Sequence, residues 1–173
     1  MAQKTVNKKL AFGVVGEFYD SSVKRATNRK LGAAGTFGKA LFLASDGTVT
    51  PTYNSSTAKT FAGIMVNPKE HINASANLAA TMTLAAGKIV GVADLGRVIV
   101  KAANAVKIGD KAFSCVTAGT GTGTNYAVGD ICGGTAAPSS SAAAGGVFVE
   151  LTGATFNIVE AEAGELAVLE LNK

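Results

Sequence analysis

The residue types that support catalysis are scarce in this sequence, and their spacing does not assemble a site. His71 is the only histidine. A metal site requires two or more converging His, Cys or carboxylate ligands, and residues 67–71 (NPKEH) supply one acid beside it. A nucleophilic triad would have to converge on the same loop, and the sequence has no G-x-S-x-G elbow. We therefore expect His71 to be a loop residue without a catalytic role, and we predict no bound metal and no cofactor.

Three further features resemble chemical motifs without their required context. The Gly and Thr alternation at residues 119–124 lacks the G-x-G-x-x-G spacing and the following helix of a dinucleotide loop. Cys115 lies in a predicted strand interior, where a thiol is usually buried and inert. Glu160 and Glu162 lie in an acidic segment and are expected to be solvated, not paired as in a glycosidase. The sequence therefore predicts a protein that is not an enzyme, and a hydrolase is the weakest alternative.

The feature with functional content is the charge of the N-terminal segment. Residues 1–30 carry seven basic and two acidic side chains, whereas residues 31–173 carry nine basic and ten acidic ones. Such a segment requires an acidic partner, which could be a protein surface or a phosphate backbone. Aromatic side chains lie between the charges and would add apolar contacts. The candidate contact residues are Lys4, Lys8, Lys9, Phe12, Phe18, Tyr19, Lys24, Arg25, Arg29 and Lys30.

The chain that must position these residues has the pattern of a β protein. Short β-branched runs bounded by Gly and Asp are typical of strands. The stretch 87–117 predicts a meander of three antiparallel strands at 88–93, 97–101 and 112–116, with turns at 94–96 and 106–110. Asp46-Gly47 is expected to close a hairpin. Further strands are expected at 37–43, 48–50, 61–66, 81–84, 126–131, 146–151 and 165–171.

Length and composition favour one mainly β domain. The 173 residues are 47% hydrophobic with only 6% aromatic, and they include 21 Gly and 3 Pro. We predict a single β-barrel or β-sandwich over residues 36–173, preceded by an extended basic N-terminal arm over residues 1–35 that lies on a partner. Residues 118–124 and 133–146 are expected to be surface loops. No run approaches the roughly 18 apolar residues of a membrane span, and two cysteines suggest a reduced folding environment.

Several stretches, taken in order, resemble the structural cement (head decoration) proteins of tailed bacteriophages. The resemblance implies a non-enzymatic protein on the outer surface of the virion, made in the host cytoplasm. Its partner would be the major capsid protein, whose neighbouring subunits it would tie together in an icosahedral head. The stretches are 13–18 (GVVGEF), 38–40 (GKA) with Asp46-Gly47, 61–70 (FAGIMVNPKE), 96–100 (GRVIV) with 108–110 (IGD), and 166–171 (LAVLEL).

Two questions stay open at this level. Exposed sheet edges would need covering, so we expect a homo-oligomer at a capsid symmetry axis, with a dimer preferred. The alternative function is a small nucleic-acid-binding β-barrel, which would place the arm on phosphates and lose affinity steeply with salt. The β body shows no basic stripe that would continue such a groove, so nucleic acid is the less favoured partner, and no membrane contact is expected.

Overall fold

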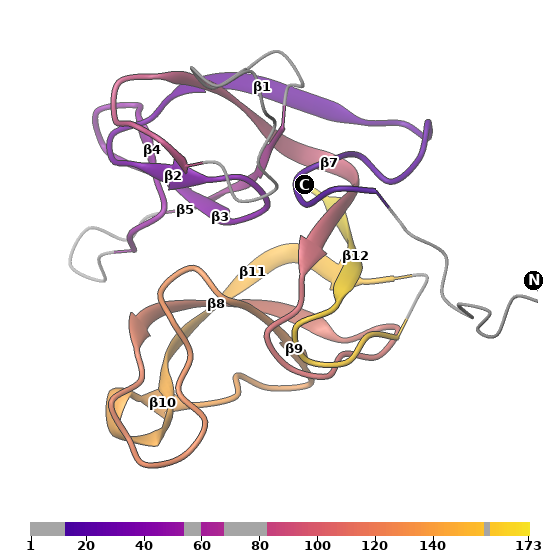
Figure 1. The fold of residues 1–173 in the computed structure, drawn as a ribbon. Helices are drawn as coiled ribbons and strands as arrows, with labels where there is room; N and C mark the ends of the chain where they lie inside the picture. The colour runs from indigo at the N-terminus through magenta and orange to yellow at the C-terminus, as the bar shows by residue number, and fades with distance from the viewer. Residues whose placement is uncertain (1–12, 54–59, 68–82, 158–159) are drawn as a thin grey trace, which may run out of the picture.

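The computed structural model describes residues 13–53, 60–67, 83–157 and 160–173, and the regular secondary structure of these residues is almost entirely β-strand (Figure 1). One sheet has the strand order β4-β3-β5-β7-β12-β11-β8-β9, with β1 also paired to β7 and β10 to β11, while β2 and β6 form a separate pair. The elements are β1 (Arg25–Lys30), β2 (Gly35–Thr36), β3 (Ala40–Leu43), β4 (Val49–Thr50), β5 (Thr60–Val66), β6 (Thr83–Leu84), β7 (Ile89–Lys101), β8 (Lys111–Ala118), β9 (Ile131–Gly134), β10 (Ser140–Ser141), the short 3-10 helix η2 (Ala142–Ala144), β11 (Gly146–Phe156) and β12 (Leu166–Asn172).

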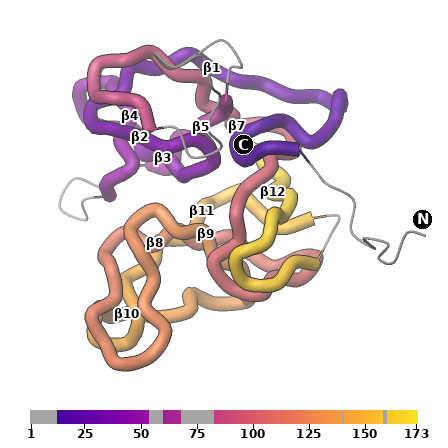
Figure 2. Tube along the Cα trace, in the orientation of Figure 1, coloured from indigo at the N-terminus to yellow at the C-terminus, as the bar shows by residue number. Residues whose placement is uncertain are grey.

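β7 is the strand that connects two lobes (Figures 1 and 2). The first lobe consists of β1 to β6 with the N-terminal half of β7, and the second consists of β8 to β12 with its C-terminal half. In the first lobe, β7 pairs with β1 and with β5, which therefore lie on its two opposite edges. In the second lobe it pairs with β12 from Leu95 to Lys101. The predicted turn at 94–96 is therefore wrong, because these residues continue one strand of 13 residues.

The predicted meander over 87–117 is also wrong in its strand order, since β12 and β11 lie between β7 and β8. The turn at 106–110 is confirmed: the amide of Asp110 donates to the carbonyl of Lys107 (3.1 Å), and Gly109 has a φ of 91°. The Asp46-Gly47 hairpin is confirmed too, because β3 pairs with β4 and Gly47 adopts a φ of 79°. In contrast, Tyr126 to Asp130 do not form a strand, and β9 begins only at Ile131.

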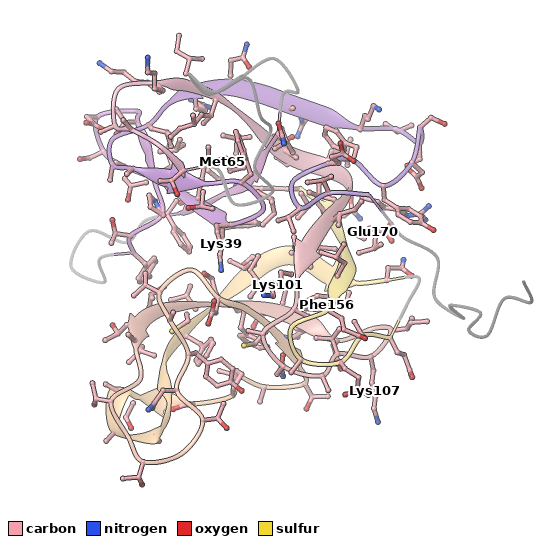
Figure 3. The ribbon with its side chains drawn as sticks, viewed as in Figure 1. Lys39, Met65, Lys101, Lys107, Phe156 and Glu170 are labelled. Atoms are coloured by element: carbon pink, nitrogen blue, oxygen red, sulfur yellow. The ribbon has the colours of Figure 1, made fainter. Side chains whose placement is uncertain are left out.

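The core is divided between the two faces of the first-lobe sheet. Successive residues of β3 point to opposite sides, so that Phe42 joins one buried cluster and Leu41 another. The cluster of Phe42 extends into the second lobe, where it includes Phe156 and Leu169. The cluster of Leu41 stays within the first lobe and includes Met65, which lies far from Phe156 in Figure 3. The prediction of a mainly β, sandwich-like fold is thus confirmed, and the described strands do not close into a barrel.

An ion pair also connects the two lobes. Lys39, which precedes β3, projects from the first lobe toward the second (Figure 3), where its Nζ lies 3.1 Å from Oδ1 of Asp130. Gly129, beside this aspartate, has a φ of 85° and packs under the aliphatic part of Lys39. The pair is only partly exposed, so it adds some charge attraction to the shared hydrophobic cluster.

Candidate partner-contacting surface

The described part of the basic N-terminal segment lies along one edge of β7. The amide of Gly16 donates to the carbonyl of Ile99 (2.8 Å), and that of Tyr19 donates to the carbonyl of Arg97 (2.8 Å). β1 then pairs with residues 89–95 farther along the same edge, opposite β5 and β12. The segment therefore forms a ladder that spans both lobes (Figure 1). The sequence predicted an extended arm over residues 1–35 and gave no indication of the strand β1 within it.

Phe18, one of the predicted contact residues, packs on the protein's own core. It is half-buried against the larger hydrophobic cluster and forms a bridge with Val98. The Nζ of Lys24 lies 5.2 Å from the centroid of the Phe18 ring, a distance suited to a cation–π contact. Val23, which lies between Phe18 and Lys24 in the sequence, is 80% exposed. Tyr19 is also partly buried. The roles of Phe18, Tyr19 and Lys24 as contacts to a partner stay predictions.

The acidic groups near this segment are already engaged within the chain. Asp20 Oδ2 lies 2.9 Å from Arg97 Nη1, and Glu170 lies 3.7 Å from Arg97 Nε. The hydroxyl of Ser22, followed by the Arg97 guanidinium, holds the pKa of the Asp20 carboxyl below its ordinary value. Asp94 Oδ1 accepts a hydrogen bond from Arg25 Nε at 2.7 Å. That bond also raises the pKa of Arg25.

Arg29 and Lys30 complete β1 and contribute its net positive charge. All six side chains of β1 are exposed. Among the described residues, neither Arg29 nor Lys30 has a carboxylate within ion-pairing distance. The described residues thus bring Lys24, Arg25, Arg29 and Lys30 together on one strand and the residue before it. The other predicted positions Lys4, Lys8, Lys9 and Phe12, like His71, lie outside the described residues.

In the described part of the chain, the titratable groups outside this segment form no cluster that could hold a metal ion. Cys115 and Cys132 are both free and buried, as expected for Cys115. Burial, followed by the charge of Asp130, raises the pKa of the Cys132 thiol to about 12 and also raises that of Cys115. Within the described ranges, no three His, Cys, Asp or Glu side chains cluster closely enough to hold a metal ion. The same residues contain no helix long and apolar enough to cross a bilayer.

The β fold and the exposed cationic strand indicate a general class of protein, and the sequence comparison gives the family. A β body that presents a cationic strand at its edge has a surface suited to binding an acidic partner. Over residues 2–172, the sequence matches the family described as structural cement protein (E217 gp24/Pam3 gp6). The chain belongs to this family: it is a phage cement protein with a capsid-stabilising, structural role in the virion. The resemblance inferred from short stretches of sequence is confirmed.

Solved structures provide a separate comparison of the fold. A chain of "The capsid of Myoviridae Phage XM1" superposes with a TM-score of 0.65 at 15% identity, covering 99% of this chain and 98% of that one. The two proteins therefore share their fold over nearly the whole length. The head fiber gp8.5 N base of bacteriophage phi29 gives a TM-score of 0.38 at 16% identity, over 87% of this chain and 95% of that one, which is too low to support an argument. No curated protein matches the sequence.

Proposed function

We propose that this cement protein binds the outer surface of an icosahedral phage head and bridges neighbouring subunits of the major capsid protein. The observation that carries the proposal is the family match over residues 2–172. A clip that binds the assembled lattice and not the free subunits stabilises the lattice by mass action. Many copies act on one shell, so each copy needs only modest affinity. The packed genome presses outward, and bridging contacts between subunits oppose that pressure.

The basic N-terminal segment is the proposed contact with the capsid. Its described part is held on β7 by backbone hydrogen bonds, so Lys24, Arg25, Arg29 and Lys30 have fixed positions relative to both lobes. An ordered contact surface loses little conformational entropy when it binds. Lys4, Lys8, Lys9 and Phe12 precede it in the chain and would extend the same contact. Acidic patches on the capsid protein are the complementary surface.

Binding to capsids that lack the cement protein tests this proposal. Deleting residues 2–12 removes Lys4, Lys8 and Lys9 and leaves in place every described residue that pairs with β7. We expect at least tenfold weaker binding in a co-sedimentation titration, with an unchanged cooperative melt. A matched control replaces Lys101, Lys107 and Lys111 with Gln, which removes the same formal charge from the second lobe. If the control loses as much affinity as the deletion, net charge and not the segment governs binding.

Two parts of the proposal have their own tests. A homo-oligomer, preferably a dimer, would cover exposed sheet edges, and sedimentation equilibrium of the free protein measures its mass. A monomer in solution together with isolated copies on the capsid would contradict it. The nucleic-acid alternative predicts that the full chain retards DNA in a mobility shift at low salt, with retardation lost as salt rises. We expect no retardation at a protein concentration that saturates capsids.

A further inference from the structure

Along most of β1, the outer edge has no partner strand among the described residues. β1 pairs with β7 along its inner edge. On the outer side, Leu31, the residue after β1, forms a parallel bridge with Val49 of β4, and Arg25 to Asn28 pair with no described strand there. All six of its residues are exposed, so neither face is covered. An edge strand of this kind presents a row of backbone N–H and C=O groups that another extended chain can use.

The hydrogen-bond pattern identifies which backbone groups face outward. The amide of Leu31 donates to the carbonyl of Lys88 (2.8 Å), in the same register as the pairing of Arg29 with Val90. In an antiparallel ladder, backbone groups that point to the partner strand alternate along the chain. Thr27 and Arg29 therefore share the inward direction of Leu31. The outward groups belong to Ala26, Asn28 and Lys30. Lys30 lies next to the bridge between Leu31 and Val49, so Ala26 and Asn28 present the open donors and acceptors.

Charge selects the kind of chain that fits this edge. Lys24, Arg25, Arg29 and Lys30 lie within seven residues, and no acidic residue occurs between Asp20 and Asp46. Two copies paired through β1 would place like charges opposite one another, which is unfavourable in a sheet. An extended segment rich in Asp and Glu would instead gain both ladder hydrogen bonds and charge attraction.

From this geometry we propose that the outer edge of β1 accepts an extended acidic segment of the capsid protein as an additional strand. The inference rests on the proposed function and specifies how the basic segment recognises its partner. The bond between Arg25 and Asp94 and the ladder to β7 already order β1 in the free protein. Only the incoming segment then has to lose conformational freedom.

A proline at position 28 tests the strand addition. Asn28→Pro removes an outward N–H and places the ring where the incoming strand would lie, whereas the ladder to β7 keeps its hydrogen bonds. Asn28→Ala removes the same side chain but keeps the N–H. In co-sedimentation with capsids lacking the cement protein, we expect binding by the proline variant to fall about tenfold below that of the alanine variant. Equal binding by the two would overturn the inference and leave the proposed function intact.

Amide hydrogen exchange of the unmodified protein gives a measurement that does not depend on how the proline variant folds. On binding to capsids, the amides of Ala26 and Asn28 should exchange at least tenfold more slowly, because they become ladder donors. Unchanged exchange in capsid-bound protein overturns the inference. Protection that appears in the free protein as its concentration rises would identify a second copy as the occupant and also overturn it. Failure of the unmodified protein to bind capsids would instead count against the proposed function itself.

Discussion

Replacing Phe18 with alanine separates two roles for the N-terminal segment, an anchor on the protein's own core and a free contact for a partner. Full burial of a phenylalanine side chain contributes roughly 1.5–3 kcal/mol, and truncation in a core costs about 3–5 kcal/mol. Phe18 is not fully buried, so only part of the truncation cost applies, and the Lys24 contact adds roughly 0.5 kcal/mol. We therefore expect Phe18→Ala to lower the free energy of unfolding by about 2 kcal/mol.

For a chain of this length, 1 kcal/mol corresponds to about 2–4 °C in Tm, so the expected shift is roughly 4–8 °C. The protein has no tryptophan, so far-UV circular dichroism during heating and in urea is the suitable assay. Val23→Ala is the matched control, since Val23 is 80% exposed and should change Tm by less than about 2 °C. If Phe18→Ala melts like Val23→Ala, the segment is not anchored through this ring, and the reasoning is refuted.

Two further predictions concern the second lobe. Gly121→Ala should destabilise the protein by about 1–3 kcal/mol, because its Cβ would lie 2.2 Å from the carbonyl oxygen of Ala143. Gly123→Ala is the control: its Cβ would have no atom within 4 Å, so the urea midpoint should stay unchanged. Burial raises the pKa of the Cys132 thiol to about 12 in the folded state, whereas an ordinary thiol has a pKa of 9.0. Between these two pH values the unfolded state therefore binds fewer protons than the folded state. The free energy of unfolding should fall as pH rises through this range. Urea midpoints measured at several pH values should decline less steeply for Cys132→Ala, and parallel slopes would contradict the assignment.

Local signals in the sequence predicted those parts of the fold that local chemistry determines. The Asp46-Gly47 hairpin follows from a glycine that must adopt a positive φ in a tight turn. Asp94-Leu95-Gly96 has a similar composition, and Gly96 also has a positive φ of 108°, yet no turn forms. A Cβ on Gly96 would lie 3.0 Å from the Cβ of Lys24, so this glycine allows a distant segment to approach. Composition alone does not distinguish the two uses of glycine.

The sequence showed the basic charge of the candidate site but not the strand, β1, that carries part of it. The sequence of β1, RATNRK, shows no alternation of apolar and polar residues because both of its faces are exposed. Its extended conformation depends on pairing with residues 89–95, from Lys30 with Ile89 to Arg25 with Leu95, which are far away in the chain. Long-range pairing of this kind leaves no periodic signal in the strand itself. The excess of basic side chains, in contrast, is a property of composition and was visible directly.

The ladder along β7 gives the N-terminal segment two separable functions. Residues whose backbone groups face β7, such as Thr27 and Arg29, hold the segment in place across the first lobe, and Gly16 to Tyr19 do the same across the second. The residues that alternate with them direct their backbone N–H and C=O groups away from β7, where a partner can bind them. Backbone perturbations at alternate positions should therefore sort into effects on folding and effects on capsid binding. A segment lying freely on the capsid would show no such alternation, because every residue in it would be equally available.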